Sequence, residues 1–264
     1  MPYVQNDGVE IFYESVGEGF PVILQHGLTD NYEGWYGKSR EVNYVKTLQD
    51  KYQVVLLDAR GHGKSGKPHQ PEKYAMKYMV GDVVAVLDEL NIEKAVFWGY
   101  SMGGRIGLAA AKYAPERFTA YIIGGQGLSE KDSKVQIEAH QGYIKLLENG
   151  NQYFIDFLEK RRGSKLQDWE YEMWHNADTE AYIAYMSYYE DIGMAEYLPK
   201  VSAPFLFYVG SLDKNPYGAA IRGSEVIPNA EFVSLSGVNH SGASIGTKPA
   251  LPYVIKFLEQ VTNR

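Results

Sequence analysis

The chain has 264 residues, of which 45% are hydrophobic, 22% charged and 14% aromatic, and its formal net charge is −7. This composition can bury the core of one large domain, and it excludes a disordered chain, a collagen-like repeat and a small disulfide-stapled scaffold. The sequence contains no cysteine, which also excludes thiol nucleophiles, disulfides and thiolate metal sites.

Membrane insertion and nucleic-acid binding are not expected. The segment Met1–Gly8 lacks a basic start and an apolar run, and no stretch of about 18 apolar residues follows, so neither a secretory signal nor a membrane span is predicted. The absence of cysteine fits a reducing compartment, and we expect a cytoplasmic protein. No basic residues cluster into a stripe that would neutralise a phosphate backbone.

The chain up to about Gly127 alternates short apolar runs with amphipathic segments, a pattern typical of a mainly parallel sheet covered by helices. Apolar side chains at helical spacing predict a helix over Val80–Leu90, and a second helix is predicted over Arg105–Tyr113. Three short, almost wholly apolar runs closed by turn residues predict strands buried on both faces: residues 21–25, 52–58 and 95–98.

The pattern changes after residue 127. Between residues 128 and 200 the apolar positions recur every three or four residues, which predicts consecutive helices inserted as a lid. The core is then formed by residues 1–127 and 201–264. After the insertion, two apolar runs predict strands and a last amphipathic run predicts a helix: residues 205–209, 231–235 and 251–261.

A G-x-S-x-G pattern around Ser101 (residues 99–103) matches a nucleophile elbow, in which a serine sits on the sharp turn between a buried strand and a helix. Ser101 has the predicted strand before it and the predicted helix after it. A second copy of the pattern, around Ser244, has no strand before it and is interpreted as a loop or cap. Ser101 is therefore the candidate nucleophile.

A serine hydroxyl needs a base, and the base needs a carboxylate to orient it. Asp213 directly follows the strand predicted to end at residue 209, and His240 follows the strand predicted to end near residue 235. Open α/β sheets place their chemistry at the carboxyl ends of strands, and nucleophile-elbow enzymes carry the order Ser, Asp, His. The other histidines do not fit this order, and His26 is interpreted as bracing a loop.

The oxyanion formed in such a reaction needs two N–H donors. One is expected from the backbone of Met102, directly after the nucleophile, and the other from the loop after an early strand. We assign the second donor to the N–H of Leu28, which follows Gly27 in that loop. The Leu28 side chain then forms part of the pocket wall.

Residues 61–66 match G-x-G-x-x-G and contain Gly-Lys-Ser, two patterns found at nucleotide sites. Pro68 and Pro71 follow where a dinucleotide site needs a helix, and Asp58 stands where a P-loop needs glycine. The segment is interpreted as a tight turn held by Asp58 and Arg60. Because no His-Glu-x-x-His or carboxylate-rich loop occurs either, we expect no metal and no cofactor.

Together these motifs resemble the serine α/β-hydrolase superfamily, in particular its small lidded esterases, lactonases and carbon–carbon bond hydrolases. The resemblance implies an α/β-hydrolase fold, a mostly parallel twisted sheet flanked by helices with an inserted helical lid. It also implies nucleophile, acid and base roles for Ser101, Asp213 and His240. It covers nearly the whole chain and rests on five segments: residues 26–27, 58–65, 99–104, 210–213 and His240.

Two positions separate subgroups of this superfamily. Haloalkane dehalogenases and epoxide hydrolases of the superfamily carry aspartate at the elbow, where this chain has Ser101. Hydrolases of ring-cleavage products usually carry tryptophan directly after the histidine, where this chain has Ser241. Both positions favour an esterase.

The predicted lid holds 8 basic and 14 acidic residues, most of the negative charge of the chain, and such a field repels anions. Tyr182, Tyr185 and Tyr189 are expected to share one helical face that packs on the core. We therefore expect a carboxylic-ester hydrolase acting on small to medium, neutral acyl substrates through an acyl-enzyme. The alternatives are a lactonase or carbon–carbon hydrolase with the same residues, and a ligand receptor with vestigial turnover.

Overall fold

The computed structural model describes residues 2–37, 41–128 and 134–263. Its strands are β1 (Tyr3–Asn6), β2 (Val9–Val16), β3 (Phe20–Gln25), β4 (Tyr52–Leu57), β5 (Ala95–Tyr100), β6 (Phe118–Gly124), β7 (Phe205–Gly210) and β8 (Ala230–Leu235). They form one sheet in the order β1-β2-β4-β3-β5-β6-β7-β8, parallel from β4 to β8 with β1 and β2 antiparallel. The predicted mostly parallel sheet is confirmed.

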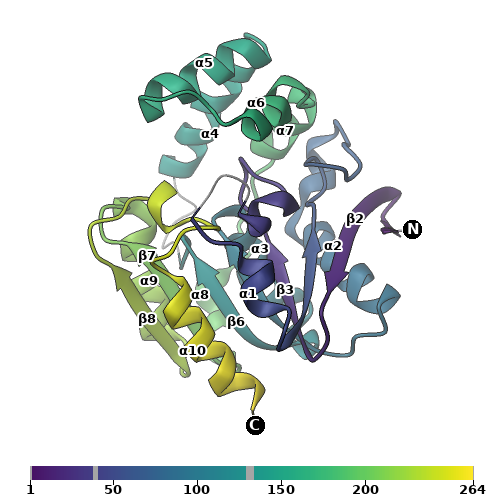
Figure 1. Cartoon of the computed structure of the whole chain (residues 1–264), viewed down its shortest axis with the longest axis vertical. Helices are drawn as coiled ribbons and strands as arrows, with labels where there is room; N and C mark the ends of the chain where they lie inside the picture. The colour runs from purple at the N-terminus through teal and green to yellow at the C-terminus, as the bar shows by residue number, and fades with distance from the viewer. Residues whose placement is uncertain (1, 38–40, 129–133, 264) are drawn as a thin grey trace.

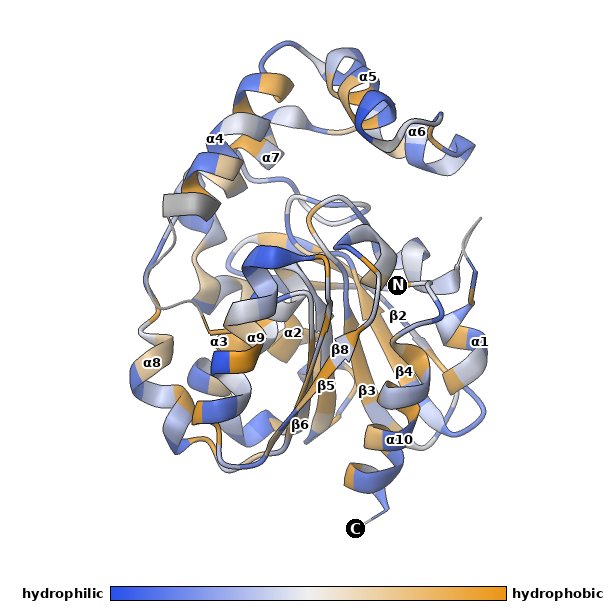
Figure 2. Ribbon diagram, turned by 90° about the vertical axis from the view of Figure 1, so that its left-hand side faces the viewer, coloured by the Kyte–Doolittle hydropathy of each residue, from blue (hydrophilic) through white to orange (hydrophobic). Residues whose placement is uncertain are grey.

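Helices cover both faces of the sheet (Figure 2). α2 (Met76–Glu89), α3 (Met102–Tyr113) and α9 (Lys214–Val226) pack on one face, and α1 (Tyr44–Leu48) and α10 (Leu251–Thr262) pack on the other. The central strands β3 to β7 are apolar because both of their faces are buried, as their largely unbroken apolar runs predicted.

Between β6 and β7 the described residues contain helices and no strand (Figure 1). The helices are α4 (Lys134–Leu147), α5 (Asn151–Arg162), α6 (Asp168–His175), α7 (Thr179–Ser187) and α8 (Met194–Tyr197). Residues 129–133, where the predicted insertion begins, lie outside the described residues. Tyr182 and Tyr185 are buried on α7 as expected. The expectation for Tyr189 is wrong, because α7 ends at Ser187 and the chain continues extended.

The turn after β4 is tied to α2 by a buried ion pair, which also accepts a hydrogen bond from β1. The Arg60 guanidinium donates to both carboxylate oxygens of Asp82, at 2.8 Å from Nε and 2.6 Å from Nη2. Both side chains are almost wholly buried. Asn6, on β1, donates to the same carboxylate at 2.7 Å. Arg60 therefore holds its loop as predicted, through a partner on α2.

The loop after β4 also contacts α7. The His69 imidazole lies between two carboxylates of the α7 amino terminus, with Nε2 at 3.0 Å from Asp178 and Nδ1 at 2.9 Å from Glu180. The hydrogen bond to Asp178, followed by the charges of both carboxylates, raises the pKa of His69 above its usual value of 6.5. The positive charge of Lys67, in the same loop, also acts on the Asp178 carboxylate.

No described helix combines the length and apolar character needed to cross a bilayer.

Replacing Asp82 with alanine leaves the Arg60 guanidinium buried without its counter-charge. We expect the Asp82→Ala variant to lose about 3–5 kcal/mol of unfolding free energy, measured by urea denaturation. As a control, Lys51→Ala removes one partner of the exposed pair with Glu259, where a change below about 1 kcal/mol is expected. Equal losses in the two variants would contradict a structural role for the buried pair.

The contact of His69 with α7 should weaken at high pH. Because the folded-state pKa is raised, the contact is fully present below pH 6.5 and is lost as the pH rises through the raised value. We expect lower hydrogen-exchange protection of the α7 amides at pH 9 than at pH 6, after correction for intrinsic exchange rates. His69→Gln should abolish this difference, and its persistence in the variant would assign it to another group.

Candidate active site

Ser101 occupies a strained turn between β5 and α3. Its backbone is left-handed, with φ 54° and ψ −110°, a conformation that is costly for a residue with a Cβ. The turn is possible because Gly99 and Gly103 pack against each other, and a Cβ on Gly99 would overlap the Gly103 carbonyl. A Cβ on Gly103 would overlap the carbonyls of Gln25 and His26. The elbow predicted from the glycine spacing is thus built by backbone contact.

The turn lies where the sheet order reverses. β3 pairs with β4 on one side and with β5 on the other, so the loops leaving β3 and β5 diverge and open a crevice at the carboxyl ends of the strands. The register pairs Gln25 with Gly99. A Cβ on Gly27 would stand 3.5 Å from the Ser101 Cβ. The His26–Leu28 loop therefore borders Ser101.

His240 contacts Ser101 and Asp213 with opposite ring nitrogens. The Ser101 hydroxyl lies 3.0 Å from Nε2, and Nδ1 lies 2.5 Å from Oδ2 of Asp213. Asp213 is 14% exposed and the imidazole is 40% exposed, so the ring is the more accessible of the two to solvent and ligands. Tyr100, directly before the elbow, donates its hydroxyl to the His240 carbonyl at 2.5 Å.

The loops that carry Asp213 and His240 are joined by backbone hydrogen bonds. After β7, the Ser211 N–H donates to Leu235 at 2.9 Å and the Leu212 N–H donates to Val238 at 3.0 Å. These bonds continue the β7–β8 pairing beyond the ends of the strands. The three residues predicted to converge at one edge of the sheet do so because neighbouring strands deliver them there.

The two N–H groups predicted as oxyanion donors belong to segments that border Ser101. Helical hydrogen bonding begins at the Arg105 N–H, which donates to the Ser101 carbonyl, so the Met102 N–H has no acceptor within α3. In the described part of the chain, the Leu28 N–H also makes no hydrogen bond. Among the described residues, neither N–H group is therefore committed to a backbone acceptor.

Two buried histidines contact backbone carbonyls of the loop that contains Leu28. His26 Nδ1 lies 2.8 Å from the Gly27 carbonyl, and His62 Nε2 lies 3.0 Å from the Leu28 carbonyl. Burial lowers the pKa of His26 to about 3 and that of His62 to about 4, so both rings are neutral near pH 7. His26 braces the loop as predicted. The expected Ser, Asp, His order along the chain predicts no catalytic role for His62.

The segment containing Gly61 to Gly66 is a tight turn. The Gly61 N–H donates to the Gly66 carbonyl at 2.9 Å, and the buried Asp58 carboxylate accepts the N–H groups of Tyr32 and Lys64, each at 2.8 Å. The short helix η2 (Pro71–Tyr74) begins only after the turn. Within the described ranges, no group of three or more His, Asp or Glu side chains is arranged to hold a metal ion.

Ser244 has the local role predicted for it. Its hydroxyl donates to the Ser241 carbonyl at 2.7 Å, at the end of the short helix η5 (Ser241–Ala243).

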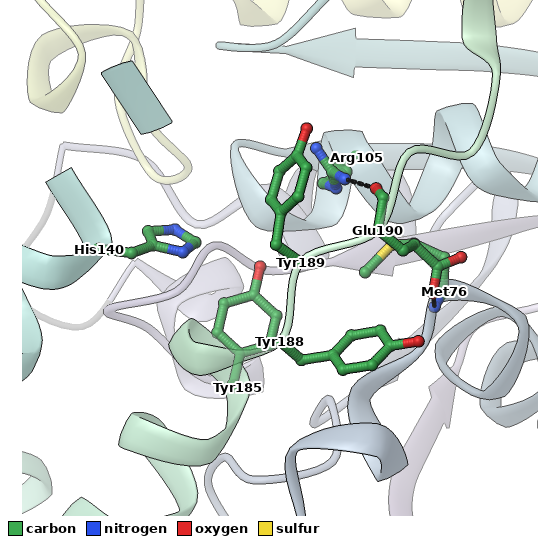
Figure 3. A pocket seen from close by; sticks show the side chains of 7 residues that line it. All are labelled: Met76, Arg105, His140, Tyr185, Tyr188, Tyr189 and Glu190. Carbon is green, nitrogen blue, oxygen red and sulfur yellow. Dashed lines mark hydrogen bonds between the residues drawn. The ribbon is translucent and has the colours of Figure 1, made fainter. Parts of the chain in front are cut away.

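A small cavity of about 10 Å³ lies between α3 and the chain after α7 (Figure 3). Arg105, one helical turn after Ser101, donates to the Glu190 carbonyl at 2.9 Å, and its guanidinium lies 5.3 Å from the Tyr189 ring centroid. The volume accommodates about one water molecule. The residues that line the cavity are Met76, Arg105, His140, Tyr185, Tyr188, Tyr189 and Glu190.

Comparisons with known proteins agree with this architecture. Residues 21–170 match the family model described as the alpha/beta hydrolase fold. The chain is 32% identical over 119 residues to epoxide hydrolase 3 of Siraitia grosvenorii, which covers 45% of this chain and 36% of that protein. It is 39% identical over 102 residues to 3-oxoadipate enol-lactonase 2 of Acinetobacter baylyi, which covers 39% of this chain and 35% of that protein. These matches thus span little more than a third of each relative.

A structure from a study of carboxylesterases of Nitrososphaera gargenis superposes with a TM-score of 0.81 over 99% of each chain at 22% identity. At this identity the likeness concerns the fold.

Gly103→Ala tests the backbone contact that forms the elbow. Because the new Cβ would overlap two carbonyls of β3 and its loop, we expect a loss of about 1–3 kcal/mol in unfolding free energy. Gly142→Ala is the matched control: a Cβ on Gly142, in α4, meets nothing within 4 Å, and alanine should stabilise this helix by about 0.5–1 kcal/mol. A Gly103→Ala variant as stable as the wild type would contradict the close contact.

Proposed function

We propose that this chain, which belongs to the alpha/beta hydrolase family, is a serine hydrolase that cleaves carboxylic esters through an acyl-enzyme. The observation that carries the proposal is the contact of His240 with both Ser101 and Asp213. A base in reach of the hydroxyl, oriented by a carboxylate, is the arrangement that activates a serine. The serine at this position also distinguishes the chain from family members that use aspartate there.

In the acylation half-reaction, the Ser101 oxygen attacks the ester carbonyl carbon while His240 Nε2 takes the hydroxyl proton. The carbonyl oxygen becomes an oxyanion, which accepts hydrogen bonds from the N–H groups of Met102 and Leu28. As the bond between the carbonyl carbon and the alcohol oxygen breaks, His240 returns the proton to that oxygen. Asp213 accepts the Nδ1–H and stabilises the imidazolium between the two transfers.

In the second half-reaction, water attacks the acyl carbon and gives a proton to His240. The second tetrahedral intermediate collapses, the acid leaves, and the proton returns to the Ser101 oxygen. The 40% exposure of the His240 side chain allows water to approach the face on which this step occurs. The same chemistry opens a lactone, in which the leaving alcohol stays attached to the acyl group.

The proposed substrate is a small to medium, neutral acyl ester. We assign residues 128–200 as a lid, since α7 packs over the loops after β4. Its excess of acidic residues disfavours anionic acyl groups. A lactone is the second candidate, favoured by the 39% identity of one segment to an enol-lactonase. A panel of p-nitrophenyl esters of increasing chain length, with lactones of matched carbon number, separates the two by kcat/KM.

Ser101→Ala removes the nucleophile from the proposed reaction. We expect the variant to fold with wild-type stability and to lose ester turnover by about 10⁴-fold or more. A fluorophosphonate should label the wild type on Ser101 and leave Ser244 unlabelled, as determined by peptide mapping. Ester turnover retained in Ser101→Ala, or labelling on Ser244, would disprove the assignment of the nucleophile.

A further inference from the structure

The Leu28 backbone is held on both sides by buried histidines. His26 contacts the carbonyl of the peptide that carries the Leu28 N–H, and His62 contacts the Leu28 carbonyl itself. The Ala59 N–H donates to His26 Nε2 at 3.0 Å, so the His26 proton lies on Nδ1 and faces Gly27. Peptide groups are planar, so the contact of His26 with the Gly27 carbonyl sets the direction of the Leu28 N–H in the same peptide. The contact of His62 with the Leu28 carbonyl holds the next peptide and so restricts rotation of the Leu28 backbone on its other side.

The His62 ring also contacts the helices between β6 and β7. Its centroid lies 4.7 Å from that of Tyr182 in an edge-to-face arrangement, and 6.2 Å from that of Tyr185. Both tyrosines are buried on α7. His62 is itself wholly buried, so its position is set jointly by α7 and by the turn after β4. His62 thus links α7 to the loop that borders Ser101.

We propose that His62 is a positioning residue for the oxyanion donor: its Nε2–H holds the Leu28 carbonyl, and Tyr182 holds the ring. The proposal rests on the proposed function, since it takes the Leu28 N–H as the donor to the oxyanion. The other ring nitrogen of His62, Nδ1, lies 3.1 Å from the Arg60 carbonyl oxygen. A neutral ring has one proton for the two carbonyls, and the proposal assigns that proton to Nε2.

A positioning role predicts a specific kinetic effect. The oxyanion exists only in the tetrahedral states, so a misdirected Leu28 N–H lowers kcat and leaves KM nearly unchanged. Loss of a whole oxyanion donor costs about 10²–10³-fold in kcat. A donor that is retained but less well directed should cost less, about 10–100-fold.

The experiment compares His62→Phe, His62→Gln and His69→Gln in the full chain. His62→Phe keeps a ring against Tyr182 and removes the donor, and His62→Gln keeps a side-chain N–H. His69→Gln is the matched control, because it alters a contact between the same loop and α7 without touching Leu28. kcat and KM are measured on a p-nitrophenyl ester, with binding of an aryl trifluoromethyl ketone, which forms a tetrahedral adduct with an active serine.

For His62→Phe we expect kcat to fall about 10–100-fold with KM within about 3-fold of the wild type, and ketone affinity to fall by the same factor as kcat. His62→Gln should recover part of the loss, and His69→Gln should resemble the wild type. In the wild type, ¹⁵N NMR of the imidazole should show the proton of His62 on Nε2. If His62→Phe does not fold, His62→Gln and the NMR measurement still test the proposal.

Four results would overturn the inference: wild-type kcat in a folded His62→Phe, a rise in KM alone, an equal loss of kcat in His69→Gln, or a His62 proton on Nδ1. Failure of the proposed function gives a different result, because ester turnover would then survive in Ser101→Ala. If turnover depends on Ser101 and the His62 variants match the wild type, only the positioning role fails.

Discussion

The arrangement of the site depends on one steric constraint, the contact of backbone with backbone at the turn that carries Ser101. β5, the start of α3 and the end of β3 meet so closely that Gly99 and Gly103 leave no space for a Cβ. Ser101 is held at a positive φ as a result, and its hydroxyl contacts Nε2 of His240. β3, β7 and β8 then deliver the Leu28 loop, Asp213 and His240 to the same edge of the sheet.

The central sheet and the converging residues could be predicted from sequence because each has a local signal. A strand buried on both faces is a nearly unbroken apolar run, and the glycines at its end mark the close turn. Asp213 follows a strand of this kind, and His240 follows the edge strand β8, so their place at one edge follows from parallel topology. For Ser101 and Ser244 the pattern is the same, and only the flanking strand and helix distinguish them.

The features that the sequence did not predict depend on tertiary contacts or on weak local patterns. β1 has no fully buried position, β2 mixes buried with exposed positions, and the two strands form one end of the sheet. α9 contains a proline and two glycines, which hide its helical spacing. Arg60 was recognised as holding its loop, but its partner Asp82 lies 22 positions away on α2, and no pattern in the sequence joins the two. His62 comes too early in the chain for the Ser, Asp, His order, and the residues that it contacts lie in the loop after β3 and on α7.

The neutral state of the two buried histidines suits the role of the loop that they hold. A charged imidazolium at either position would have to be desolvated, which disfavours the charge and lowers the pKa to about 3 for His26 and about 4 for His62. Between about pH 5 and pH 8 both rings therefore keep one protonation state, and the carbonyls that they contact keep one orientation. The proposed oxyanion donor is then a backbone dipole held in one orientation, which needs no reorganisation when charge develops beside it.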